Sequence, residues 1–266
     1  MLKLRALLLA SVLGIVLSGS ACSRASFDQA AARPATVLTV AAASDLRGAL
    51  DEIAAEFEAQ TGYRVRLLFG SSGQVAQQIE NGAPYDVFAS ASLAFIERLA
   101  QQALIDPGSI SLYARGRIVL ATNKRSGVSV QSLGALADPA IRRVTIANPA
   151  HAPYGIAARE ALIHAGVWEA VRPRLVLAEN VLQASQYVQT GDAPVGIIAL
   201  SIAVQMKDEV EFVLIDESAH APLRQAIGIV SRSINKDAAQ QFIQLVVSEQ
   251  GQAVLRRYGF EPPAAP

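Results

Sequence analysis

The stretch VLTVAAASDLRGALDEIAAEF, residues 37–57, decides how this chain begins to fold. An apolar run over residues 36–43 is typical of a buried strand. From Asp45 to Gln60, apolar residues recur at spacings of three and one, which indicates an amphipathic helix. Ser44 lies between the two, and we expect it to cap the helix. The pattern predicts a strand followed directly by a helix.

The same alternation continues along the rest of the chain. Strand-like apolar runs alternate with helix-like segments, and no internal repeat or low-complexity tract interrupts them. This order predicts an α/β protein with mostly parallel sheets and helices on both faces. One long helix is expected near the C-terminus, over residues 237–259.

Two lobes are expected, because the chain has two segments suited to cross between them. These are YARGRIVLATN, residues 113–123, and HAPLRQAIGI, residues 220–229. We therefore predict that residues 36–117 and 225–266 form lobe 1 and residues 118–224 form lobe 2. The C-terminal helix would return to lobe 1, and a ligand cleft would lie between the lobes.

The N-terminus has the pattern of an export signal. Lys3 and Arg5 precede an apolar run, residues 6–17, that is too short to span a bilayer as a permanent helix. We predict a signal peptide over residues 1–22 and a flexible lead-in over residues 23–35. Two outcomes stay open: a lipid attached to Cys22, which would tether the chain to a membrane, or soluble cleavage after Ala21.

Charge and composition exclude several classes of function. The 23 basic residues less Lys3 and Arg5 leave 21 against 23 acidic ones, so we expect neither nucleic acid nor an anionic membrane surface as a partner. The chain has one cysteine and three histidines, with no cluster at the spacing of metal ligands. No residue is therefore predicted to bind a metal ion directly.

Four strand-to-helix junctions point instead to an anion site. Ligands of open parallel sheets bind beyond the carboxyl ends of the strands, where the unpaired amides of helix starts gather. At these junctions no lysine or arginine lies at the tip, so amides and hydroxyls would have to hold the anion. A serine at a helix start is most often only a cap, so a single junction would carry little weight. The candidate residues are Ser44, Ser72, Tyr154 and Val181.

These residues lie in segments that resemble a known family. The segments VAAASDL, FGSSGQVAQQIENGAPYDVFASAS, IANPAHAPYGIAAREAL, AENVLQASQYVQTGDAPVGIIALS and GQAVLRRYGF are similar, in this order, to the periplasmic molybdate-binding proteins of ABC importers. The resemblance covers about residues 36–260. It implies a type II periplasmic-binding fold that captures molybdate, and also tungstate, and delivers the ion to a membrane permease. It further implies no catalysis, no cofactor and a monomer in the periplasm.

The resemblance also implies a role for each candidate residue. Ser44 and Ser72 would each donate a hydroxyl and an amide to the oxyanion, whereas Tyr154 and Val181 would donate amides. The chain departs from some members at Ala199, where a tyrosine would add a phenol hydrogen bond. Other members have a tyrosine in the third-junction loop, so the phenol of Tyr154 is a candidate replacement.

Other ligands and one other class of function stay open. Sulfate, phosphate or a small organic acid would suit the same fold. Phosphate is disfavoured, because none of Asp45, Asp86 and Glu179 is clearly placed to accept its proton. An exported serine hydrolase would need Ser72 to pair with His151, but no carboxylate is evident to orient such a pair.

Overall fold

The computed structural model describes residues 36–263. The predicted signal peptide, the lead-in, Cys22 and residues 264–266 lie outside this range. Within it, every helix is too short or too polar to cross a bilayer.

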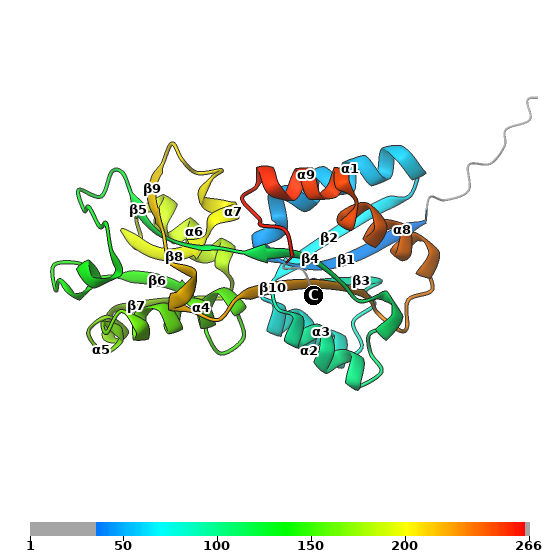
Figure 1. Ribbon diagram of the computed structural model, residues 1–266, viewed down its shortest axis with the longest axis horizontal. Helices are drawn as coiled ribbons and strands as arrows, with labels where there is room; N and C mark the ends of the chain where they lie inside the picture. Colours follow the sequence, from blue (N-terminus) through cyan, green and yellow to red (C-terminus); the bar gives the residue numbers. More distant parts are fainter. Residues whose placement is uncertain (1–35, 264–266) are drawn as a thin grey trace, which may run out of the picture. The chain divides into compact units, whose positions relative to one another are not determined.

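Residues 36–263 form two five-stranded sheets, in the orders β2-β1-β3-β10-β4 and β7-β6-β8-β5-β9 (Figure 1). The strands of the first sheet are β1 Val37–Ala43, β2 Arg64–Gly70, β3 Val87–Ser90, β4 Ser111–Gly116 and β10 Leu223–Ile229. Those of the second are β5 Ile118–Asn123, β6 Val144–Ala147, β7 Leu175–Ala178, β8 Val195–Ala199 and β9 Val210–Leu214.

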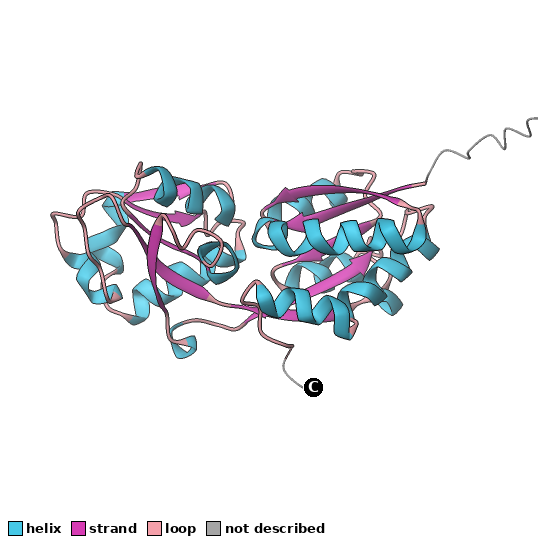
Figure 2. Cartoon of the chain, turned by 90° about the horizontal axis from the view of Figure 1, so that it is seen from above, coloured by secondary structure: helices cyan, strands magenta, loops and turns pink. Residues whose placement is uncertain are grey.

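Helices flank both sheets (Figure 2). They are α1 Arg47–Thr61, α2 Ser72–Glu80, α3 Leu93–Gln101, α4 Pro153–His164, α5 Trp168–Val171, α6 Val181–Thr190, α7 Leu200–Ala203, α8 Lys236–Val247 and α9 Glu249–Arg257. In the first sheet, α1, α8 and α9 share one core with the strands, and α2 and α3 share another. The second sheet has one core, to which α4 and α6 contribute. As predicted, the C-terminal helices pack in the first lobe.

Both sheets are mostly parallel in the sense predicted, with four strands in one direction, and each is mixed because one strand runs against them. In the first sheet β1 runs parallel to β2 and β3, but β10 is antiparallel to β3 and β4. In the second, β6 is parallel to β7 and β8, but β5 is antiparallel to β8 and β9. The reason is the route of the chain. Because β5 and β10 enter their sheets from the other lobe, each starts at the edge where the parallel strands end.

The long C-terminal helix predicted over residues 237–259 is two helices. Ser248 has extended backbone angles, φ −64° and ψ 166°, and separates α8 from α9. Its hydroxyl oxygen accepts a hydrogen bond from the amide of Gly251 at 3.2 Å and so caps α9. A side chain at Gly251 would place its Cβ 2.2 Å from the carbonyl oxygen of Leu245. Residues 248–252, SEQGQ, carry no apolar side chain, so the apolar pattern pauses where the two helices meet.

The chain passes between the sheets at Arg117 and again over residues 215–222. The first passage is where the lobe boundary was predicted. At the second, β10 begins at Leu223, two residues before the predicted boundary. The exact residue limits of the lobes stay a prediction.

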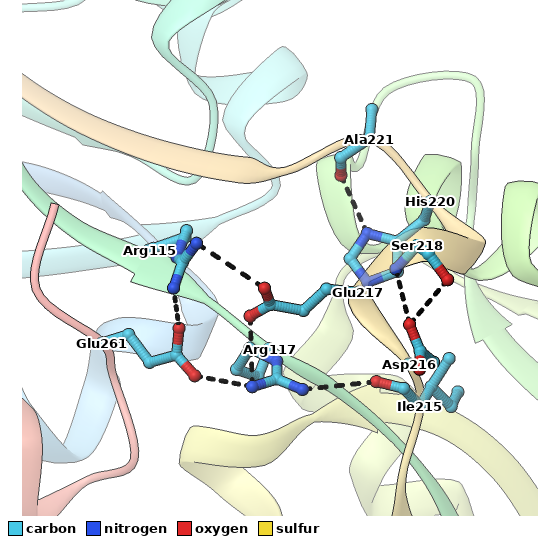
Figure 3. Close-up of polar contacts among 9 residues, drawn as sticks. All are labelled: Arg115, Arg117, Ile215, Asp216, Glu217, Ser218, His220, Ala221 and Glu261. Carbon is cyan, nitrogen blue, oxygen red and sulfur yellow. Dashed lines mark hydrogen bonds and ion pairs between the residues drawn. The ribbon is translucent and has the colours of Figure 1, made fainter. Parts of the chain in front are cut away.

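A cluster of ion pairs joins the two passages to the C-terminal segment (Figure 3). Arg117 lies 3.1 Å from a carboxylate oxygen of Glu217 and 2.6 Å from one of Glu261. Arg115, on β4, pairs with the same two glutamates. Partial burial acts to raise the pKa of Glu261, but hydrogen bonds and charges from the two arginines outweigh it. The net pKa is therefore lower than usual.

We expect Glu261→Gln to lower the free energy of unfolding at neutral pH. A carboxyl group with a lowered pKa stabilises the fold when ionised, and this stabilisation is lost as the pH falls through that pKa. The difference from the wild type should therefore be smaller at about pH 4, below the ordinary pKa of a glutamate, than at neutral pH. Urea unfolding at both pH values measures it, with Glu97→Gln, an exposed change on α3, as the control. An equal difference at both pH values would contradict this ionic role.

Candidate ligand-binding site

The structure brings the four predicted site residues together around one pocket. Ser44, Ser72, Tyr154 and Val181 all line it, and the space between its atoms is about 180 Å³, part of it open to solvent. Ser44 and Ser72 come from the first lobe, at the ends of β1 and β2. Tyr154 and Val181 come from the second, at the starts of α4 and α6. Their role as ligands of an oxyanion stays a prediction.

Three helices begin at the pocket, and the first amides of a helix have no hydrogen-bond acceptor within that helix. Ser72, Tyr154 and Val181 lie in the first turns of α2, α4 and α6, where amides have no intrahelical partner. Within residues 36–263 these three amides donate no hydrogen bond to another backbone group. Pro153 begins α4 and has no amide hydrogen that would need an acceptor. The helix starts therefore contribute partial positive charge and free donors.

The two serine hydroxyls are held by backbone amides. Ser72 Oγ accepts from the amide of Ala91 at 2.9 Å, and Ser44 Oγ accepts from the amide of Leu182 at 3.3 Å. Both serines are almost completely buried. Because each oxygen already accepts a hydrogen bond, its own proton is left to be donated. The pocket therefore has neutral donors, which suit an anion.

The capping role expected of Ser44 is wrong. A short 3₁₀ turn, Ser44–Leu46, precedes α1, and the N-cap residue of α1 is Leu46, which makes no side-chain capping hydrogen bond. At α2 the cap is Ser71, which forms a capping box with Gln74. The sequence offered two adjacent serines, and only the backbone path distinguishes the cap from the pocket residue.

The phenol of Tyr154 lies on a carboxylate of the other lobe. Its hydroxyl donates to Asp45 Oδ2 at 2.9 Å and accepts from Gln225 Nε2 at 3.1 Å. Gly116 gives it room, because a Cβ there would lie 2.3 Å from the phenol oxygen. Ala199, where a tyrosine was considered, is buried at the end of β8 and does not line the pocket. The phenol of Tyr154 thus donates its hydrogen bond to Asp45 in this structure.

Asp45 is the pocket residue that sequence reasoning missed. It was read as part of a helix and as not clearly placed near the ligand, but it lines the pocket and is 1% exposed. Burial raises its pKa to about 6, although hydrogen bonds from Gln225 and Tyr154 act to lower it. An aspartate at a helix start is common, so nothing local indicated that this one is buried.

Direct contacts close the mouth of the pocket between the lobes. Ser71 Oγ lies 2.7 Å from His151 Nδ1, and the amide of Gly73 donates to the carbonyl oxygen of His151 at 2.9 Å. A Cβ at Gly73 would lie 2.5 Å from that oxygen, so glycine permits the approach. Gln74 Nε2 donates to Glu179 Oε2 at 2.5 Å. These contacts join the two lobes beside the pocket.

The histidine at the mouth does not make a hydrolytic site with Ser72. His151 contacts Ser71, whose hydroxyl oxygen also accepts from the amide of Gln74. In the part of the chain that the structure describes, no group of three histidine, cysteine or acidic residues could hold a metal ion. The geometry offers hydrogen-bond donors for binding an anion.

Known proteins resemble this chain over nearly all of the described residues. Residues 38–261 match the model of the bacterial extracellular solute-binding protein family. A molybdate-binding protein of Azotobacter vinelandii is 33% identical over 236 residues, which is 87% of this chain and 92% of that protein. One of Rhodobacter capsulatus is 32% identical over 209 residues, 79% of this chain and 82% of that protein.

A solved structure extends this similarity to the fold. The periplasmic molybdate-binding protein of Azotobacter vinelandii aligns with a TM-score of 0.80 at 33% identity, covering 85% of this chain and 99% of that one. The match confirms the predicted two-lobed periplasmic-binding fold. The chain belongs to the family of bacterial extracellular solute-binding proteins.

Proposed function

We propose that this protein captures molybdate, and also tungstate, outside the cytoplasmic membrane and delivers it to the permease of an ABC importer. The observation that carries the proposal is a pocket lined by two serine hydroxyls and by three helix-start amides that have no acceptor within residues 36–263. The relatives named molybdate-binding proteins support the choice of ion. They are solute-binding proteins, not enzymes, and this chain is one as well.

Neutral donors are sufficient for a divalent tetrahedral ion. The amides of Ser72, Tyr154 and Val181 and the hydroxyls of Ser44 and Ser72 supply five. Each hydrogen bond to an ionised acceptor contributes about 1.5–3 kcal/mol. Ser44 and Ser72 are almost completely buried, and hydrogen bonds are stronger in such surroundings than in water.

Another anion, such as phosphate or sulfate, is the second candidate, and the position of Asp45 bears on phosphate. Phosphate was disfavoured because no carboxylate was clearly placed to accept its proton, but Asp45 lines the pocket. Sulfate and small organic acids would use the same donors. Ion size, which separates molybdate from sulfate, depends on how closely the two lobes approach.

Calorimetric titration with molybdate, tungstate, sulfate and phosphate tests the choice of ion. We expect dissociation constants below about 1 μM for molybdate and tungstate, because several charge-assisted bonds act together. Sulfate should bind at least tenfold more weakly. Tight binding of sulfate or phosphate with weak molybdate would keep the pocket and overturn the cargo.

We expect Ser72→Ala to weaken molybdate binding by about 1–3 kcal/mol, because a hydroxyl donor to the ion is lost. Ser109→Ala is the matched control. Ser109 is also buried and accepts a backbone amide, from Ile229 at 2.8 Å, but it does not line the pocket. Titration of both variants measures affinity, and thermal unfolding measures stability. Equal affinity in Ser72→Ala and the wild type would remove Ser72 from the site.

We further propose that the protein works in the periplasm as a monomer. Cys22, outside the described residues, would decide whether it is tethered to the membrane. The intact mass of the exported protein distinguishes the two outcomes. A chain that begins at Cys22 and carries added lipid mass is tethered, whereas a chain without that mass is free. Sedimentation with and without molybdate tests the monomer.

A further inference from the structure

The pocket contains a carboxylate that the proposed function leaves without a role. The two oxygens of Asp45 have different surroundings. Oδ2 accepts hydrogen bonds from the Tyr154 phenol at 2.9 Å and from Gln225 Nε2 at 2.7 Å. Oδ1 is buried and has no hydrogen-bond partner within residues 36–263. A buried ionised oxygen without a partner is costly, so Oδ1 requires a proton or a ligand.

The groups that face Asp45 from the neighbouring elements are neutral. Tyr154 lies on α4 and Tyr113 on β4, and burial raises the pKa of both phenols well above the ordinary value. Gln225 comes from β10, and Ser201 of α7 donates its hydroxyl to the backbone oxygen of Asp45 at 2.9 Å. The helix α6 begins at Val181 next to the turn that contains Asp45, and Val181 carries no charge.

The nearby charged groups are engaged elsewhere. Arg47, two residues along the chain, is exposed, and its guanidinium lies over the Phe69 ring at 4.9 Å from the centroid. At the pocket mouth, His151 contacts Ser71, and Glu179 accepts from Gln74. No cation therefore compensates the charge of Asp45 among the groups that set its pKa.

We propose that Asp45 binds the oxyanion as a neutral carboxylic acid, with its proton on Oδ1 donated to the ion, so that binding of a divalent oxyanion takes up one proton from solvent. This inference rests on the proposed function, because it needs an oxyanion in this pocket. An ionised carboxylate and a dianion would repel each other at close range in a site with little water. Protonation removes this repulsion and adds a donor. The proton returns to solvent when the ion leaves.

The raised pKa of Asp45 makes protonation accessible near neutral pH. Burial brings the pKa to about 6, and an approaching anion raises it further. Below this pKa most molecules are already protonated and competent to bind. Above it the competent fraction falls tenfold per pH unit, and the apparent affinity falls with it.

The reverse arrangement makes the opposite prediction. If Asp45 stayed ionised, Oδ1 would accept a proton carried by the ligand, such as that of monohydrogen phosphate. Binding would then strengthen as the pH rises, and it would need the carboxylate. Molybdate carries no proton at neutral pH, so the proposed cargo requires a donor at Oδ1. The pH dependence of affinity separates the two arrangements.

Calorimetric titration with molybdate at about pH 6 and about pH 8 tests the proposal on the wild type, Asp45→Asn and Asp51→Asn. With a pKa of about 6, the wild-type dissociation constant should rise about 50-fold between the two pH values. Asparagine imitates the protonated acid, so Asp45→Asn should bind equally at both and more tightly than the wild type at about pH 8. Asp51, exposed on α1, is the control and should follow the wild type.

Two further readouts do not depend on the folding of Asp45→Asn. Titration of the wild type in two buffers with different ionisation enthalpies should show uptake of about one proton at about pH 8. Tyr154→Phe removes a hydrogen bond that lowers the pKa of Asp45. The fall in affinity should therefore move to higher pH in this variant. A merely structural tyrosine would weaken binding without shifting its pH dependence.

The outcomes separate this inference from the proposed function. A wild-type affinity that does not fall with pH, or the same fall in Asp45→Asn, overturns the role of Asp45 and keeps molybdate. Sulfate, which is divalent at both pH values, repeats the test. If sulfate binds with the expected fall and molybdate does not bind, the cargo is wrong and the inference stands. Phosphate binding that strengthens with pH and needs Asp45 overturns the inference. Silence from all three ions overturns both.

Discussion

Helices that pack on two different sheets begin at the same small pocket, and their first amides lack an acceptor in their own helix. The binding chemistry of this protein depends on this meeting of helix starts. An amide in the first turn of a helix has no acceptor in its own helix, so it must find one elsewhere. The amides of Ser72, Tyr154 and Val181 meet between the lobes. Neither lobe alone brings these donors together. The route of the chain, which passes twice between the sheets, is therefore what makes the site.

Neutral donors give the site a kind of selectivity that cations would not. A lysine attracts any anion through its charge, whereas fixed amides and hydroxyls bind most tightly an ion whose oxygens match their positions. The hydroxyls of Ser44 and Ser72 are oriented because each oxygen accepts a backbone amide. In the neutral form that we propose, the carboxyl group of Asp45 adds one more donor without a charge. The pocket therefore selects its ligand mainly by the positions of its donors.

The sequence predicted the parts of this structure that local rules govern. The first strand and helix were evident from residues 37–57, and Ser44, Ser72, Tyr154 and Val181 followed from their places at strand-to-helix junctions. What it missed depends on distant parts of the chain. The direction of β10 follows from its entry from the other lobe. The break at Ser248 lies in the polar stretch SEQGQ, residues 248–252, which also suits the exposed face of one continuous helix.

Asp45 shows most clearly why local reading fails at a site of this kind. An aspartate beside a helix start normally stabilises the helix while in contact with water. Here Tyr154 of the second lobe and Gln225 of a strand that returns from it cover the carboxyl group. Burial weakens the usual preference for the ionised form and raises the pKa of Asp45 to about 6, because its effect exceeds that of both hydrogen bonds. The contacts between the lobes therefore change the pKa of the carboxyl group that we propose as a ligand of the oxyanion.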